Sequence, residues 1–133
     1  MPRSQTLNND FTYQEAKPLF LVDDLVIATK FYCDVLGFEK KWAWGAPEIR
    51  VGVGPKSAPN QTPFEIHLIT DPEIGPSGTS FVYFHVTNIE SLYERCRACG
   101  ANIYLELGDR DWGMKDFRVR DPFGNRMGFG ETL

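Results

Sequence analysis

The fold of this chain is decided by residues 22–38, which read VDDLVIATKFYCDVLGF. Apolar residues recur in this stretch at intervals of three or four, at Leu25, Ala28, Tyr32 and Val35. That spacing places them on one face of a helix. Asp24 stands where an N-cap is preferred, and Gly37 stands where helices often end in a left-handed conformation. The stretch therefore predicts an amphipathic helix that follows a strand in the apolar run 19–22.

The same pattern returns in the second half of the chain. Residues 81–86 form a strand-like run, and the helical spacing then recurs at Ile89, Leu92, Cys96 and Cys99. Asn88 takes the place of the N-cap and Gly100 the place of the stop. Further strands are predicted after each helix, at residues 38–44, 48–53 and 64–70, and at residues 101–106, 115–120 and 126–130. Each half therefore has the order βαβββ.

A segment rich in proline and glycine, residues 71–79, separates the two halves and is typical of a linker. We expect a polar lead-in over residues 1–15, a first module over 16–70, this linker, and a second module over 80–133. The sequence Asp121-Pro122-Phe123-Gly124-Asn125 suits a type I turn between the last two strands. One small sheet cannot bury both of its faces alone. We therefore expect an α+β fold in which the modules pair, with helices on one face and a concave surface on the other.

Composition and charge narrow the classes of function. The chain has 133 residues, which is enough to bury a core without disulfides or metal ions. Its 14 basic and 18 acidic residues give a net charge of −4, which argues against nucleic-acid binding because phosphate contacts need a basic surface. No apolar run approaches the roughly 18 residues of a membrane span, and the polar start has no signal-peptide pattern. We expect a cytoplasmic protein that binds neither nucleic acid nor membrane.

The three cysteines, an odd number, fit a reducing compartment better than a disulfide framework. Cys96 and Cys99 form a Cys-x-x-Cys pattern in the last turn of the second predicted helix, on its apolar face. Redox motifs of this kind lie instead at a helix N-terminus, where the dipole lowers the thiol pKa. We interpret both residues as small buried hydrophobic groups, with a redox or zinc role as the alternative. Cys33 lies off the apolar face and is expected to be partly exposed.

Four motifs, taken in order, resemble the vicinal-oxygen-chelate superfamily of glyoxalases, bleomycin-resistance proteins and extradiol dioxygenases. They are Val22-Asp23-Asp24-Leu25, Phe31-Tyr32, Val35-Leu36-Gly37-Phe38 and Asp121-Pro122-x-Gly124-Asn125. The resemblance covers residues 17–131 and is closest to the bleomycin-resistance-like members. It implies paired βαβββ modules that form a U-shaped mixed sheet around a ligand cavity, usually in a homodimer.

The resemblance also implies where a metal ion would bind. Metal-dependent members carry His or Glu at one inward-facing position on each of four strands. The matching positions in this chain are Lys17, Glu65, Phe81 and Gly128. A protonated lysine, a phenyl ring and a hydrogen atom donate no lone pair to a metal. We therefore expect no metal ion or other cofactor, with an unusual divalent-metal site at Glu65, His67 and His85 as the alternative.

Aromatic residues are abundant, with ten Phe, five Tyr and three Trp, whereas histidine occurs only twice. Alternation along one strand predicts a shared face for Phe38, Lys40, Trp42 and Trp44. Alternation along another strand predicts a face of Phe81, Tyr83 and His85, opposite to a helix-facing set of Val82, Phe84 and Val86. Both histidines have a purely structural alternative, in which they are only hydrogen-bonded within the sheet.

The loop before the penultimate strand resembles, over Trp112-Gly113-Met114-Lys115-Asp116-Phe117, a segment that borders the ligand groove in bleomycin-resistance-like members. Anchoring of the loop is the alternative role of Trp112. Three arginines on the strands that follow are interpreted as solvated residues, with lining of the groove as the alternative; they are Arg118, Arg120 and Arg126.

These observations predict a metal-free protein that binds an antibiotic-like aromatic ligand and sequesters it without covalent change. A positively charged ligand is one option. The expected ligand contacts are Trp42, Trp44, Glu65, His67, Phe81, Tyr83, His85 and Trp112. No catalytic residue is assigned. The alternatives are a metal-dependent lyase or dioxygenase and, less specifically, a metal-free enzyme built on the same cavity.

Overall fold

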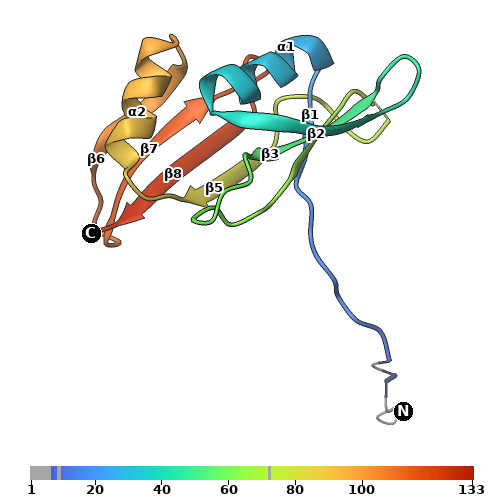
Figure 1. Cartoon of the computed structure of the whole chain (residues 1–133), viewed down its shortest axis with the longest axis horizontal. Helices are drawn as coiled ribbons and strands as arrows, with labels where there is room; N and C mark the ends of the chain where they lie inside the picture. The colour runs from blue at the N-terminus through green and yellow to red at the C-terminus, as the bar shows by residue number, and fades with distance from the viewer. Residues whose placement is uncertain (1–6, 9, 72) are drawn as a thin grey trace, which may run out of the picture.

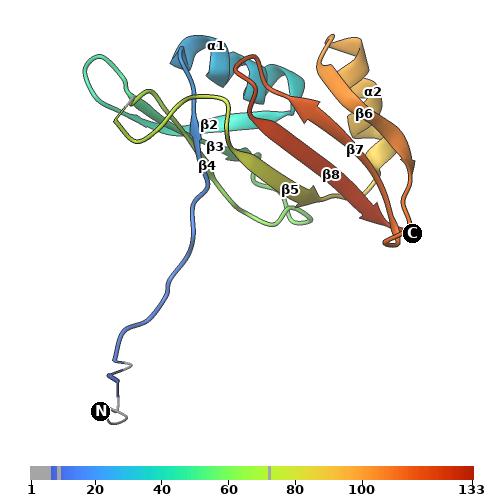
Figure 2. The same cartoon turned by 180° about the vertical axis from the view of Figure 1, so that it is seen from behind.

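The structure is a computed structural model that describes residues 7–8, 10–71 and 73–133. It contains two successive βαβββ modules, seen from opposite sides in Figures 1 and 2. The elements of the first module are β1 (Leu19–Leu21), α1 (Leu25–Lys30), the π-helical segment η1 (Phe31–Val35), β2 (Phe38–Trp44), β3 (Arg50–Pro55) and β4 (Ile66–Ile69). The elements of the second module are β5 (Phe81–His85), α2 (Ile89–Ala98), β6 (Asn102–Asp109), β7 (Met114–Arg120) and β8 (Arg126–Thr132).

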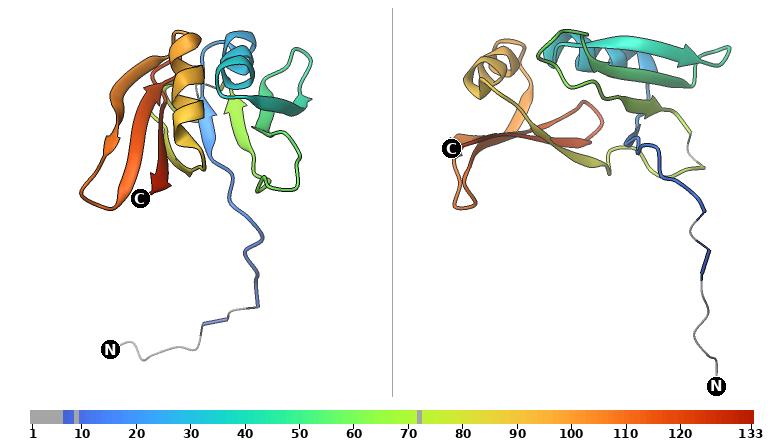
Figure 3. Two further views of the ribbon diagram at one scale, coloured as in Figure 1. Left: turned by 60° about the vertical axis from the view of Figure 1, so that its left-hand side comes forward. Right: turned by 60° about the horizontal axis from the view of Figure 1, so that its bottom comes forward.

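Each module forms one mixed four-stranded sheet with the same topology. The strand orders are β1-β4-β3-β2 and β5-β8-β7-β6. In each sheet the first pair, β1 with β4 and β5 with β8, is parallel, and the other pairs are antiparallel. Both helices lie on the same side of the molecule, and residues 10–16 extend away on the other side (Figure 3). The predicted α+β class and the pair of βαβββ modules are confirmed.

The first helix follows the sequence prediction until its last turn. Asp24 caps α1, because its carboxylate accepts a hydrogen bond of 3.0 Å from the backbone N–H of Ile27. Gly37 ends the helical stretch with φ of +77°. Beyond Lys30 the helix widens into η1. The next buried residue after Tyr32 is Leu36, whereas Val35, which the spacing places on the apolar face, is only half-buried.

The predicted cap of the second helix is wrong. The side chain of Asn88 makes no capping hydrogen bond, and its backbone lies in the left-handed region at φ of 56°. The cap is the carboxylate of Glu131 on β8, which accepts hydrogen bonds of 3.0 Å and 3.1 Å from the N–H groups of Asn88 and Ile89. A carboxylate at this end of α2 also complements the positive end of the helix dipole.

The cysteines divide by burial. Cys96 is buried on α2, and burial raises the pKa of its thiol to about 12. Cys99 is exposed, and its predicted burial is wrong because α2 ends at Ala98, so Cys99 stands at the C-cap and outside the apolar face. Cys33 is half-buried, and burial followed by the charge of Asp34 raises its thiol pKa.

The two modules are joined by the predicted turn between β7 and β8. The N–H of Gly124 donates to the carbonyl of Asp121 at 3.1 Å, which closes the turn. Tyr32 of the first module donates its hydroxyl to the Asp121 carboxylate at 2.9 Å. The buried amide of Asn125 donates to the carbonyl of Leu21 on β1 at 3.0 Å. The turn is therefore a buried polar joint between the two modules.

Among the residues that the structure describes, no helix combines the length and the hydrophobicity needed to cross a membrane.

Candidate functional site

The first module carries an aromatic and polar cluster on the sheet face opposite α1. Val51 and Val53 of β3 are buried on the helix side, so Gly52 between them lies on the helix-free face. Gly52 pairs with Trp42 on one side and His67 on the other. The Trp42 indole covers the Gly52 backbone so closely that any side chain at that position would collide with it.

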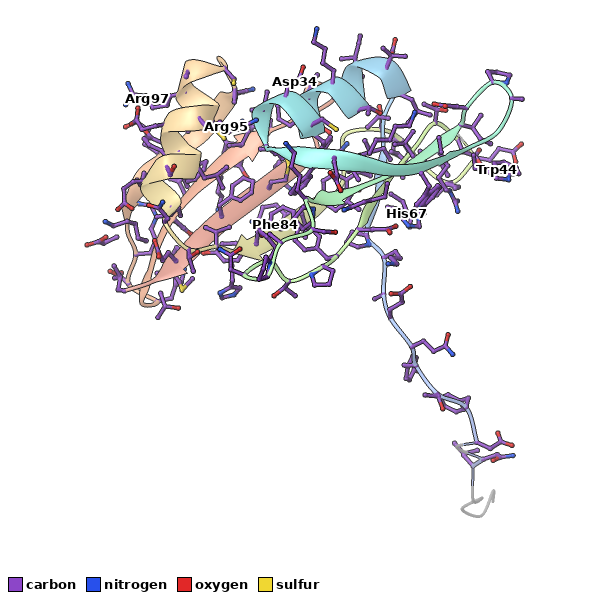
Figure 4. The ribbon with its side chains drawn as sticks, viewed as in Figure 1. Asp34, Trp44, His67, Phe84, Arg95 and Arg97 are labelled. Atoms are coloured by element: carbon purple, nitrogen blue, oxygen red, sulfur yellow. The ribbon has the colours of Figure 1, made fainter. Side chains whose placement is uncertain are left out.

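Trp42, Glu65 and His67 are in mutual contact on this face. The indole N–H of Trp42 donates to the Glu65 carboxylate at 2.8 Å. The imidazole of His67 meets the Trp42 ring edge to face, with ring centroids 4.8 Å apart. Its Nε2 lies 3.6 Å from the same carboxylate oxygen of Glu65. We call these three residues the first cluster; Figure 4 labels His67 and, further along β2, Trp44.

The predicted shared face of Phe38, Lys40, Trp42 and Trp44 is wrong. The register of β2 against β3 shifts between Lys40 and Trp42, a bulge that turns the strand by one position. Phe38 therefore packs into the core, where its ring centroid lies 6.0 Å from that of Phe84 in the second module. Trp42 and Trp44 lie on the helix-free face. The two tryptophans still reach the predicted face, with Trp44 exposed at the end of β2.

Burial lowers the pKa of His67, and the positive charges of Arg50 and Lys17 lower it further, against an opposing contribution from Glu65. The imidazole is therefore held in its neutral form, in which one ring nitrogen accepts and the other donates. A neutral imidazole beside a carboxylate and an indole can orient a polar ligand group.

We expect the free energy of unfolding to decrease as the pH falls below 6.5, the ordinary pKa of histidine. Below that pH the unfolded chain protonates His67, whereas the folded chain resists protonation until a lower pH. His67→Gln removes this decrease, because glutamine stays neutral. Urea unfolding at a series of pH values between about 5 and 8 measures the effect. The same exchange at exposed His85 is the control for losing an imidazole, and an unaltered pH dependence in His67→Gln contradicts the assignment.

The second module carries a matching cluster on its own helix-free face. Phe81, Tyr83 and His85 lie on this face of β5, while Val82 and Phe84 pack against the core, as their alternation predicts. The Tyr83 ring lies across β8, and a side chain at Gly128 or Gly130 would collide with it. Its hydroxyl donates to the carboxylate of Asp116 at 3.1 Å. Burial, and then the negative charge of Asp116, raise the pKa of Tyr83.

Sequence reasoning missed Asp116, which is fully buried on β7, and its partner Arg110. The Arg110 guanidinium donates to the Asp116 carboxylate at 2.6 Å and to its backbone carbonyl at 3.2 Å. Tyr83, Asp116 and Arg110 thus form one hydrogen-bonded chain. The alternation of Asp116, Arg118 and Arg120 along β7 was the available signal, because it predicts three charged residues on one face.

The predicted contact residues form two groups. The first group belongs to the first module and consists of Trp42, Trp44, Glu65 and His67. The second group belongs to the second module and consists of Phe81, Tyr83, His85 and the loop residue Trp112. Trp112 is near enough to Tyr83 to affect its pKa, in the direction opposite to Asp116. Within the described ranges, no hydrogen bond, ion pair or aromatic contact joins the two groups. A hollow of about 550 Å³ borders the first group and is lined by Lys17, Glu65 and the segment 55–64.

The residues at the metal positions of the resemblance do not fit a metal ion. Gly128 cannot be replaced by a ligating residue without displacing Tyr83, and Phe81 and Lys17 offer no lone pair. Glu65 and His67 are adjacent, but His85 lies on the other sheet. In the described part of the chain, no three His, Cys, Asp or Glu side chains gather in a group that could hold a metal.

Comparison with known proteins was made on both sequence and structure. The family model described as "Glyoxalase/Bleomycin resistance protein/Dioxygenase superfamily" matches residues 16–129. No curated protein sequence is significantly similar to the chain.

Solved structures with this fold include TioX from Micromonospora sp. ML1, at 19% identity and a TM-score of 0.73, with 90% of this chain and 100% of TioX covered. TnmS3, an antibiotic binding protein from Streptomyces sp. CB03234, is 21% identical with a TM-score of 0.72, and 92% of this chain and 100% of TnmS3 are covered. The fosfomycin resistance protein FosX from Listeria monocytogenes is 12% identical with a TM-score of 0.68, and 92% of this chain and 96% of FosX are covered. At these identities the likeness shows the fold alone. The family model spans most of the chain, and the chain therefore belongs to the glyoxalase/bleomycin resistance protein/dioxygenase superfamily.

Proposed function

We propose that this protein binds a planar aromatic small molecule and sequesters it without covalent change. The observation that carries the proposal is the set of open aromatic side chains of the helix-free faces. Trp44, Trp112 and Phe81 are 65%, 59% and 41% exposed, although each is large and apolar. Exposed apolar groups of this size, gathered beside a few fixed polar groups, are typical of ligand-binding surfaces.

The polar groups of both clusters suit binding better than catalysis. Glu65 already accepts a hydrogen bond from Trp42, and Asp116 is held by Tyr83 and Arg110. Carboxylates fixed in this way hold aromatic rings in place, which reduces the entropy lost when a ligand binds. The donor set at the family's metal positions is unsuitable for a metal, so the proposal contains no metal-assisted step. The name of the related TnmS3 describes an antibiotic binding protein, and we extend that ligand class to this chain as part of the proposal.

We further propose that two copies form a homodimer through their helix-free faces. In one chain the two groups of contact residues lie on separate sheets and leave their aromatic side chains open to solvent. A second copy that covers these faces would bury the exposed rings and enclose a cavity between the sheets. Light scattering is expected to give twice the chain mass of 15.1 kDa. A monomer at ligand-binding concentrations would contradict this part of the proposal.

The binding proposal is tested by titrating the protein with naphthalene, quinoline and acridine derivatives and following tryptophan fluorescence. We expect saturable quenching and recovery of the ligand unchanged by mass spectrometry, with or without EDTA. Trp112→Ala is expected to weaken binding at least about tenfold, as loss of an aromatic anchor does. Ile27→Ala, an exposed apolar residue on α1, is the matched control and leaves affinity unchanged. Chemical conversion of the ligand, or absence of binding across the series, would overturn the proposal.

A further inference from the structure

The helix-free face of the second module carries three arginines that the proposed function does not use. Alternation places Arg118 and Arg120 of β7 on this face, because Phe117 and Val119 are fully buried on the other. Arg126 of β8 pairs in register with Arg120 on one side and with Phe81 on the other. Two neighbouring strands, β7 and β8, thus bring three guanidinium groups to one side of one sheet.

Each of these arginines is held against an aromatic ring. The guanidinium carbons of Arg118 and Arg126 lie 5.6 Å and 5.3 Å from the centroid of the Phe81 ring. The guanidinium carbon of Arg120 lies 4.0 Å from the centroid of the Tyr104 ring. Such cation–π contacts fix a long side chain in one orientation. Arg126 is exposed, as the interpretation of a solvated strand residue expects, whereas Arg118 and Arg120 are half-buried.

The three arginines have no anionic partner in the described part of the chain. Most other basic side chains there do have one. Six of them have a side-chain nitrogen within 4.0 Å of a carboxylate oxygen: Lys17, Lys40, Lys41, Arg97, Arg110 and Lys115. The nearest acidic group by register, Asp116, is already occupied by Arg110 and Tyr83. Arg118 is the sharpest case, because its Nε is buried and makes no hydrogen bond. A buried donor without an acceptor is costly unless a ligand supplies the acceptor.

We infer that this face binds the anionic group of the ligand, and that the ligand is a planar aromatic acid. The inference rests on the proposed function, since it adds a charge to the aromatic ligand proposed there. A guanidinium fork matches a carboxylate, and the two hydrogen bonds are charge-assisted and directional. Phe81 lies against Arg118 and Arg126 and is 41% exposed, so its ring provides a surface on which the aromatic part can stack.

We expect an anionic ligand, whereas the sequence analysis considered a cationic ligand as one option. That option rested on the net charge of −4 of the whole chain. A bound ligand interacts chiefly with the charges within about 10 Å, because salt screens the more distant ones. On the second face Asp116 is paired with Arg110, and the charges that remain without an ion pair to the described residues are the three arginines.

The test uses three naphthalene compounds of the same shape and different charge: 2-naphthoate, 2-naphthamide and 2-naphthamidine. Titration calorimetry of the full chain is expected to give at least about tenfold tighter binding for the carboxylate than for the neutral amide, and the weakest binding for the cation. The preference for the carboxylate should shrink as salt rises from about 0.05 to 0.5 M.

Arg118→Gln and Arg126→Gln should reduce the affinity for 2-naphthoate to that for 2-naphthamide and leave the amide within about twofold. Arg97→Gln, on the outer surface of α2, is the matched control and should keep the full preference. Circular dichroism spectra identify any variant that is unfolded. Arg118→Lys keeps the charge but not the guanidinium fork, and its affinity for 2-naphthoate should lie between those of the wild type and Arg118→Gln. Equal binding of carboxylate and amide by the wild type, or tightest binding of the amidine, overturns this inference and leaves the proposed function intact. Binding of none of the three overturns this inference, and the quinoline and acridine titrations then decide whether the proposed function is overturned as well.

Discussion

Asp121→Ala is expected to lower the free energy of unfolding by about 3–5 kcal/mol, the largest stability effect of any single substitution proposed here. The Asp121 carboxylate is only 4% exposed and accepts four hydrogen bonds. They come from the Tyr32 hydroxyl, the backbone N–H groups of Phe123 and Asn125, and the Asn125 side chain. Alanine leaves these buried donors without an acceptor, and it breaks the joint between the two modules as well as the turn.

Urea unfolding of Asp121→Ala and of two companion variants measures this effect. Tyr32→Phe removes one of the four donors and should cost about 1–2 kcal/mol. Asp111→Ala makes the same exchange at an exposed loop position and should stay within about 0.5 kcal/mol of the wild type. A change below about 1 kcal/mol in Asp121→Ala would show that the joint contributes little to stability.

Gly128→Ala is expected to abolish most of the ligand affinity and to lower the free energy of unfolding by about 1–3 kcal/mol. A Cβ at this position would stand 2.6 Å from Cδ1 of Tyr83, well inside contact distance. The ring cannot give way easily, because its hydroxyl is anchored to Asp116. Displacing it opens the hydrogen-bonded chain that ends at Arg110 and disorders the stacking surface.

A double variant separates the steric effect from other causes. Tyr83→Ala combined with Gly128→Ala removes the collision, so the combined loss of stability should be smaller than the sum of the two single losses by about 1 kcal/mol or more. Ligand affinity should stay low in the double variant, because the ring is gone. Gly75→Ala is the matched control, since a Cβ there would meet only Leu21, at 4.0 Å. Additive losses in the double variant would contradict the packing of Tyr83 on β8.

The parts of the fold that local patterns encode could be predicted from the sequence. Strand β2 was predicted with its observed bounds, and Gly37 and Gly100 end their helical segments in the left-handed conformation. The π-helical widening and the bulge in β2 could not be predicted, because neither changes the apolar pattern on which the prediction depends. The prediction that Asn88 caps α2 failed for a different reason. Glu131 is 43 residues from Asn88, and only the folded sheet brings them together.

The candidate site was predictable residue by residue but not as an arrangement. Alternation places Tyr83 on the open face, yet nothing in the sequence shows that it covers Gly128 and so removes the space for a metal ligand. The polar partners were missed because burial of Asp116 depends on Arg110, which lies in the preceding loop. Net charge likewise does not show where charges are placed: this acidic chain carries, on one face of its second sheet, three arginines that form no ion pair with the described residues.

The central claim, that the helix-free faces bind an aromatic ligand, is tested most directly by the indole N–H signals of the three tryptophans. Their ¹⁵N–¹H cross-peaks can be assigned with single Trp→Phe variants and followed during a titration with 2-naphthoate. We predict that the Trp112 cross-peak shifts and saturates with the dissociation constant that calorimetry gives. Unchanged positions of all three cross-peaks, while calorimetry reports binding, would place the ligand elsewhere and contradict the claim.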